Sequence, residues 1–198
     1  MATPKRKVLF IEWATQGRDF EIDFPLMYFF EKYLDWEVHY CCVFDLWSII
    51  RLKPDIVIMS NTMGGSINVK IAKLISKSGF FFVSHTSEGY FRENAISQMV
   101  WGHNTDQQVL VDMQTVWSNN AYQLAIKKFP NLSSVLRVSG SLGHDKYQII
   151  SSFVSIPQNK PYKKRILIAG YTFNAHRIEA ARFNSIFGDK KRRQILDQ

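Results

Sequence analysis

Residues 8–21 read Val-Leu-Phe-Ile-Glu-Trp-Ala-Thr-Gln-Gly-Arg-Asp-Phe-Glu, an apolar run followed at once by a polar, charged segment. The run Val8–Ile11 is apolar at every position, which is typical of a parallel strand covered by helices on both faces. Polar residues directly after such a strand lie at the carboxyl edge of the sheet, where open α/β folds bind their ligands. This stretch therefore predicts the class of sheet and the edge that carries the function.

The alternation of apolar runs with amphipathic stretches continues along the chain and predicts β-α repeats. Strands are expected at residues 8–11, 37–44, 55–59, 80–83, 115–117 and 134–138. One helix is expected to begin at Asp23, as its cap, with Pro25 in its first turn. Further helices are expected at residues 45–52, 66–79, 95–102 and 118–130. We therefore expect an α/β fold, a Rossmann-like and mostly parallel sheet with helices on both faces.

The C-terminal part of the chain predicts a domain boundary. Residues 156–164 are polar and contain two prolines, which indicates a linker. Residues 165–170 then predict a new strand, and a helix follows from about residue 175. Because one strand and one helix cannot enclose a core, we expect residues 165–198 to begin a second domain that is cut short, after a first domain at residues 1–155. The alternative is that this last helix packs back on the first domain.

The positive charge of the chain is concentrated near its C-terminal end. The net charge is +8, and residues 160–198 hold ten Lys and Arg against three Asp and Glu, a net +7. The first 159 residues hold fifteen basic and fourteen acidic residues, so the first domain lacks the basic face of a nucleic-acid-binding protein. The basic segment could contact anionic lipid, or it could be a solvated linker and helix face.

The sequence predicts a cytoplasmic protein. It contains no run of eighteen apolar residues and no signal-peptide core at its start, so we expect no membrane span. Cys41 and Cys42 are adjacent in an expected strand, where neighbouring side chains point to opposite faces, so they make a poor disulfide pair and a poor metal site.

Charged residues after the first expected strand are the first candidates for chemistry. Glu12 ends the strand, and Arg18, Asp19 and Glu21 follow in an expected loop. A carboxylate there could deprotonate an acceptor hydroxyl, with the arginine steering an anionic group of the substrate. A solvated loop with an internal ion pair fits the same residues.

Two later strands are also followed by polar residues. Gly64 and Gly65 open a helix whose amino end suits phosphate or carboxylate, although a tight turn alone would also require them. His85 and Glu88 could act as a general base and its orienting partner, or as hydrogen-bonded turn residues. A dinucleotide GxGxxG sequence, a Walker sequence, a nucleophile elbow and a metal-ligand cluster are all absent, so no cofactor or metal is expected.

Four segments carry a resemblance to a known family. They are Glu12 with Arg18-Asp19-Phe20-Glu21, then Ser87-Glu88-Gly89, then Trp101-Gly102 with Trp117-Ser118-Asn119, and finally Ser139–Asp145, which reads Ser-Gly-Ser-Leu-Gly-His-Asp. Their order and spacing resemble bacterial surface-carbohydrate biosynthesis proteins, which are similar to capsule and teichoic-acid polymer transferases. Three positions depart from the family pattern: Asp19 replaces a glutamate, Ser87 an acid and Gly143 an arginine.

The resemblance implies a GT-B glycosyltransferase architecture, in which two Rossmann-like domains face each other. It implies transfer of a sugar from a nucleotide-sugar donor to a glycan or lipid-linked acceptor at the inner face of the membrane, with the first domain on the acceptor side. Asp19 or Glu21 would be the base. The expected substrate-binding residues are Glu12, Arg18, Gly64, Gly65, His85, Glu88, Gly89, Gly140 and Asp145.

Other functions remain open on the sequence. The chain alone is expected to have no transferase activity, because nearly all of the implied donor domain is missing. The alternatives are a non-catalytic glycan- or nucleotide-binding domain of the same fold and a UDP-sugar epimerase.

Overall fold

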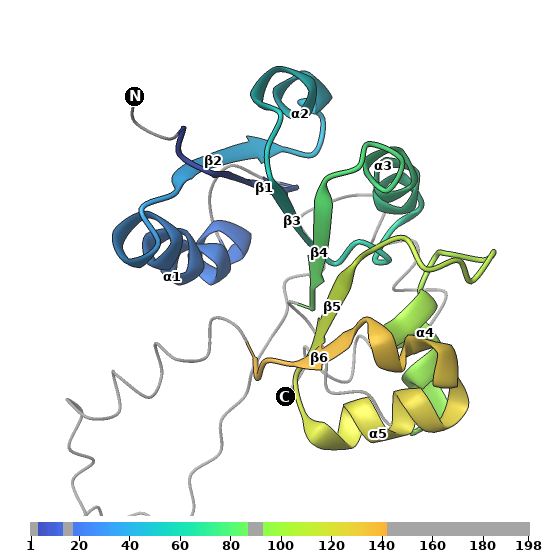
Figure 1. Ribbon diagram of the computed structural model, residues 1–198. Coiled ribbons are helices and arrows are strands. Elements are labelled where there is room, and N and C mark those ends of the chain that lie inside the picture. Colours follow the sequence, from blue (N-terminus) through green and yellow to red (C-terminus); the bar gives the residue numbers. More distant parts are fainter. Residues whose placement is uncertain (1–3, 14–17, 87–92, 142–198) are drawn as a thin grey trace, which may run out of the picture. The chain divides into compact units, whose positions relative to one another are not determined.

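The computed structural model describes residues 4–13, 18–86 and 93–141, with the side chains of Arg18, Asp19 and Leu46 excepted (Figure 1). These residues form an α/β fold around a six-stranded sheet in the order β2-β1-β3-β4-β5-β6. Every neighbouring pair of strands is parallel. The predicted fold class, a Rossmann-like parallel sheet flanked by helices, is confirmed. The predicted boundary near residue 155 lies outside the described residues.

The strands of the sheet match the six apolar runs of the sequence. They are β1 (Lys7–Glu12), β2 (Glu37–Cys42), β3 (Ile56–Ser60), β4 (Phe81–His85), β5 (Met113–Val116) and β6 (Leu136–Val138). β3 and β4 extend one and two residues beyond the predicted ends. Ser60 and His85 are therefore the last residues of strands rather than members of the following loops, and the sheet fixes their positions.

Five α-helices and two short 3-10 helices connect these strands within the described residues. They are α1 (Arg18–Tyr33), α2 (Leu46–Leu52), α3 (Ser66–Ile75), η1 (Glu93–Ala95), α4 (Ile96–Trp101), α5 (Asn119–Lys128) and η2 (Pro130–Ser134). Gly65 directly precedes α3, as the predicted helix opening requires, and the Ser118 hydroxyl caps α5 by accepting a hydrogen bond from its backbone. No described helix combines the length and apolarity that a membrane crossing requires.

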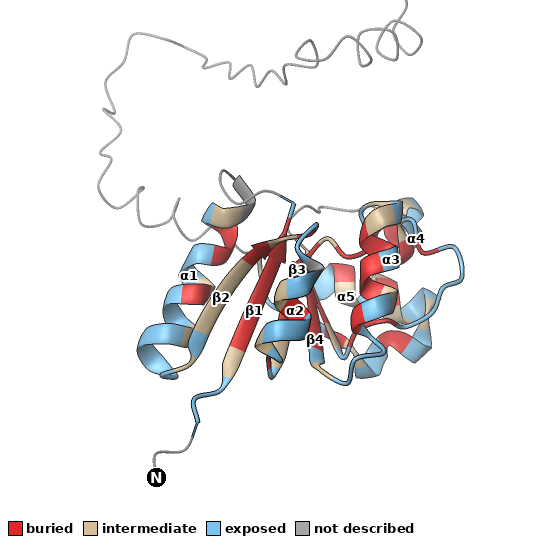
Figure 2. Ribbon diagram, turned by 90° about the horizontal axis from the view of Figure 1, so that it is seen from above, coloured by how far each residue is buried: buried red, intermediate tan, exposed pale blue. Residues whose placement is uncertain are grey.

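The strand β1 is buried on both faces, as its continuous apolar sequence predicts (Figure 2). Val8 and Phe10 pack in a cluster with Met27 of α1, whereas Leu9 and Ile11 pack in a cluster with side chains of α2 and α3. Helices thus cover both faces of the sheet at β1. This double cover is what requires an uninterrupted apolar strand.

The start of α1 differs from the prediction. The helix begins at Arg18, five residues before Asp23, and Pro25 lies inside it. A proline inside a helix removes one backbone hydrogen bond, but Phe20 packs against the apolar cluster of Val8 and Phe10 and holds the earlier turn in place. Asp23 is therefore not a cap. It is a buried residue of α1, 1% exposed.

The strand order creates a topological switch between β1 and β3. The chain leaves β1 to form β2 on one side, and it then returns to form β3 on the other side. Helices that follow β1 and β3 consequently diverge, which opens a crevice at the carboxyl ends of these strands. Glu12 and Ser60 are the last residues of the two strands, so they lie at this crevice.

Gly102 joins the end of α4 to the turn after β3. Its φ is +45°, and a Cβ at this position would lie 2.2 Å from the carbonyl oxygen of Met63. The same carbonyl accepts a hydrogen bond of 2.9 Å from the backbone of His103. The backbones therefore approach so closely that only glycine fits.

We expect Gly102→Ala to lower the free energy of unfolding by more than about 2 kcal/mol, because it adds a backbone clash to an unfavourable φ. Gly79→Ala is the matched control. Gly79 has a φ of +76°, and no atom lies within 4 Å of the place that its Cβ would occupy, so it should lose only about 1 kcal/mol. Urea denaturation measures the free energy of unfolding of both variants. Equal losses in the two variants would contradict the close approach of Gly102 to the Met63 carbonyl.

Candidate functional site

Three strands end in polar residues that lie side by side at the carboxyl edge. Ser60 of β3 is in register with His85 of β4. In β1, Ile11 pairs with Met59 of β3, and Glu12 is the next residue. All three side chains are buried, with 1% of Glu12, 3% of Ser60 and 1% of His85 exposed. Buried polar groups require partners, so their contacts define the site.

Asp23 reaches this edge from α1 and completes a buried ionic cluster. The His85 Nε2 atom lies 2.8 Å from Oδ1 of Asp23 and 3.5 Å from Oε1 of Glu12. The ring N–H is not directed at either oxygen, so these contacts are ion pairs rather than aligned hydrogen bonds. We call Glu12, Asp23 and His85 the buried triad.

Ser60 holds Glu12 by two hydrogen bonds. Its backbone N–H donates to Oε1 of Glu12 over 3.2 Å, and its hydroxyl donates to Oε2. Because Ser60 also lines the neighbouring pocket, it connects the buried triad to the ligand-accessible surface.

Burial and charge act on the triad in opposite directions. Burial raises the pKa of Glu12, and the charge of Asp23 adds to this effect, whereas contacts with His85 and Ser60 lower it. For His85, burial lowers the pKa, but the contacts with Asp23 and Glu12 outweigh it and raise the pKa to about 9. The imidazole is therefore protonated at neutral pH and supplies the positive charge between two carboxyl groups.

We expect Asp23→Asn to lower the free energy of unfolding by roughly 3 kcal/mol, because it removes one partner of a buried ion pair. Asp35→Asn is the control, since Asp35 pairs with Lys5 at 2.5 Å while its own side chain is 79% exposed. Exposed pairs contribute about 1 kcal/mol or less. Chemical denaturation of both variants measures the two losses of unfolding free energy. A loss for Asp23→Asn no larger than that for Asp35→Asn would contradict the buried ion pair between Asp23 and His85.

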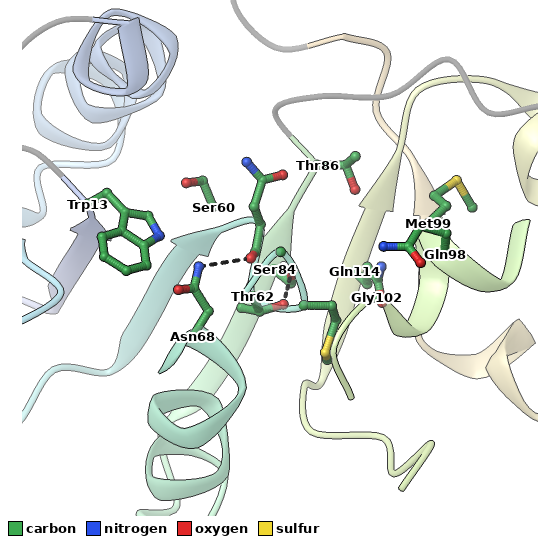
Figure 3. Close-up of a pocket in the computed structure, with 13 residues that line it drawn as sticks. Trp13, Ser60, Thr62, Asn68, Ser84, Thr86, Gln98, Met99, Gly102 and Gln114 are labelled. Atoms are coloured by element: carbon green, nitrogen blue, oxygen red, sulfur yellow. Dashed lines mark hydrogen bonds between the residues drawn. The ribbon is translucent and has the colours of Figure 1, made fainter. Parts of the chain in front are cut away.

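A pocket of about 410 Å³ lies beside the triad, over the carboxyl ends of β3, β4 and β5 (Figure 3). It is lined by Trp13, Ser60, Asn61, Thr62, Met63, Gly64, Asn68, Ser84, Thr86, Gln98, Met99, Gly102 and Gln114. None of these described lining residues carries a charge. The volume falls within the range of small-molecule sites in proteins.

Hydrogen bonds fix several polar side chains of this pocket. The hydroxyls of Thr62 and Ser84 lie 2.6 Å apart, and the amide of Asn68 donates to the Asn61 carbonyl over 3.1 Å. Trp13 and Gln98 lie on opposite sides of the pocket (Figure 3). Trp13 is 41% exposed, so part of its ring faces solvent at the pocket.

The structure brings some of the predicted site residues together. Glu12 and His85 meet in the buried triad, and Gly64 lines the pocket directly before Gly65 caps α3. His85 was predicted to work with Glu88, which lies outside the described residues. Gly140 has a φ of +80° just after β6 and does not line the pocket.

The charged segment after β1 is helical rather than a loop. Arg18, Asp19 and Glu21 belong to the first turn of α1, and the Glu21 side chain is exposed. The side chains of Arg18 and Asp19 lie outside the described residues. The same holds for Glu88, Gly89 and Asp145, so their predicted roles stay predictions.

Sequence reasoning missed Asp23 and Ser60 as site residues. Asp23 lies two residues before Pro25 and fits a helix cap, so it was interpreted as a cap rather than as a partner of His85. A polar residue at the helical position that otherwise faces the sheet was the available signal, because Asp23 lies three residues from the partly buried Leu26 and four from the buried Met27.

Comparisons with protein-family models, with curated proteins and with solved structures found no match for this chain.

Proposed function

We propose that this domain binds a neutral sugar unit of a glycan acceptor in the pocket at the carboxyl edge of the sheet. The observation that carries the proposal is the lining of that pocket, which combines hydroxyl and amide side chains with one tryptophan and no described charge. The proposed context is glycosyl transfer from a nucleotide-sugar in surface polysaccharide synthesis, and the motif resemblance supports it.

The lining suits the hydrogen-bonding chemistry of a sugar. Each sugar hydroxyl both donates and accepts, and the hydroxyls of serine and threonine and the amides of asparagine and glutamine also do both. Gln98 of α4 and Gln114 of β5 offer such groups, and the Ser60 hydroxyl, whose proton goes to Glu12, can still accept a hydrogen bond. Trp13 adds an aromatic surface against which the apolar face of a sugar ring can pack.

The same lining favours an acceptor sugar over the nucleotide part of a donor. A diphosphate carries negative charge, which proteins bind with arginine, lysine or a row of backbone N–H groups. The described lining contains no arginine or lysine, and its backbone N–H groups are those near Gly64 at the amino end of α3. Because one helix end without a cation offers little to a diphosphate, we assign the neutral acceptor to this pocket.

Transfer requires a base that takes the proton from the attacking acceptor hydroxyl as the nucleotide leaves the donor sugar. Asp19 or Glu21 is the proposed base, and both lie in the first turn of α1. Glu12 is a poor candidate, because it is 1% exposed and Ser60 donates hydrogen bonds to both of its carboxyl oxygens.

Sugar binding can be measured by titrating the 198-residue chain with neutral mono- and oligosaccharides while recording two-dimensional amide NMR spectra. We expect shifts at pocket residues. Trp13→Ala and Gln98→Ala should each weaken binding about tenfold, which corresponds to about 1.4 kcal/mol.

Trp47→Ala is the control for these titrations, because Trp47 is 71% exposed on α2 and does not line the pocket. The proposal fails if no sugar of the panel shifts the pocket resonances. It also fails if Trp47→Ala weakens binding as much as Trp13→Ala does.

A non-catalytic glycan-binding domain is the second candidate, because the described pocket lining itself contains no group able to act as a base. Asp19→Ala and Glu21→Ala, introduced into the gene in its own host, separate the two functions. Loss of polymer synthesis with unchanged sugar binding supports transfer. Unchanged synthesis in both variants supports binding alone.

A further inference from the structure

We propose that Glu12, Asp23 and His85 form a binding site for one divalent transition-metal ion, with Zn²⁺ as the probe. One imidazole nitrogen and two carboxylate oxygens of these residues lie within 4.8 Å of one another, and all three residues are buried. The site goes beyond sugar binding, and its test requires no sugar.

The distances between the three side chains fit a shared ion. Zinc binds nitrogen and oxygen ligands at about 2.0–2.2 Å, so neighbouring ligand atoms of one ion lie roughly 3–3.5 Å apart. The Nε2 atom of His85 lies 2.8 Å from Asp23 and 3.5 Å from Glu12. Small rotations of side chains would therefore place all three atoms at bonding distance from one centre.

The orientation of His85 also fits an ion better than a hydrogen bond. Its Nδ1 and Nε2 atoms and both carboxylate oxygens of Asp23 are buried without a hydrogen-bond partner among the described residues. The ion pair balances the charges of Nε2 and Oδ1 but supplies no hydrogen bond to these buried atoms, which is costly. A metal ion would displace the proton of the imidazolium into solvent and use the lone pairs of Nε2 and Oδ1 together. Ligands of one ion approach each other without pointing at each other.

Ser60 provides the outer support that metal ligands commonly have. Its backbone N–H and hydroxyl hold the two oxygens of Glu12, which fixes the orientation of this carboxylate. Each carboxylate oxygen has two lone pairs, so Oε1 can accept from Ser60 and still bind an ion.

The donor set indicates the class of metal. Magnesium and calcium prefer oxygen ligands alone, whereas imidazole together with carboxylate suits zinc, iron and manganese. Three protein ligands leave at least one coordination position open, which is the arrangement of reactive rather than purely structural zinc sites. Ser60 contacts Glu12 and also lines the sugar pocket, so the proposed metal site is a neighbour of that pocket.

The experiment is isothermal titration calorimetry of the 198-residue chain with ZnCl₂ after treatment with a chelator. We expect one tight equivalent per chain. His85→Gln and Asp23→Asn should weaken binding by about 100-fold or more, because each removes a ligand, and Ser60→Ala by about 10-fold.

His39→Gln is the matched control, because His39 also contacts a carboxylate, Glu37 at 2.7 Å, but lies at the surface. It should leave the tight equivalent unchanged. Absence of a tight equivalent in the unaltered chain overturns the proposal, as does loss of that equivalent in His39→Gln alone.

A second measurement covers variants that fail to fold. Imidazole NMR signals of the unaltered chain are recorded with and without one equivalent of Zn²⁺, and the variants His85→Gln, His39→Gln and His103→Gln assign them. We expect the His85 signals to shift. Shifts confined to histidines outside the triad, such as His39 and His103, would overturn the site.

Discussion

The structure depends on placing two carboxyl groups and an imidazole together in the interior of the domain. Glu12, Asp23 and His85 are each 1% exposed, and they come from β1, α1 and β4. Burying charge is unfavourable unless opposite charges meet at short distance. The contacts of His85 with both acids satisfy this requirement, and they tie α1 to the carboxyl edge of the sheet.

The strand order explains why this cluster lies next to a pocket. β1 and β3 are neighbours at the switch of the sheet, so their last residues, Glu12 and Ser60, meet where the following helices diverge. Ser60 links the buried triad to the pocket, because its hydroxyl donates a hydrogen bond to Glu12 and its side chain also lines the pocket. A ligand in the pocket would therefore contact the group that orients the buried triad.

Much of the fold could be predicted from the sequence, and less of the site. The continuous apolar run of β1 predicted a doubly covered parallel strand, and the polar strand ends predicted Glu12 and His85 at one edge. The predicted start of α1 was wrong, because Pro25 resembles a first-turn residue while tertiary contacts of Phe20 hold an earlier turn. Asp23 could not be predicted from the sequence as the partner of His85, because the two residues meet only through the packing of α1 on the sheet.

A double-mutant cycle between Asp23 and His85 tests the central claim most directly. Free energies of unfolding are measured by urea denaturation for the unaltered chain, Asp23→Asn, His85→Gln and the double variant. Residues in ionic contact inside a protein should show a coupling energy of about 1–3 kcal/mol. Additive losses, with coupling below about 0.5 kcal/mol, would contradict the presence of a buried ionic cluster at the carboxyl edge of the sheet.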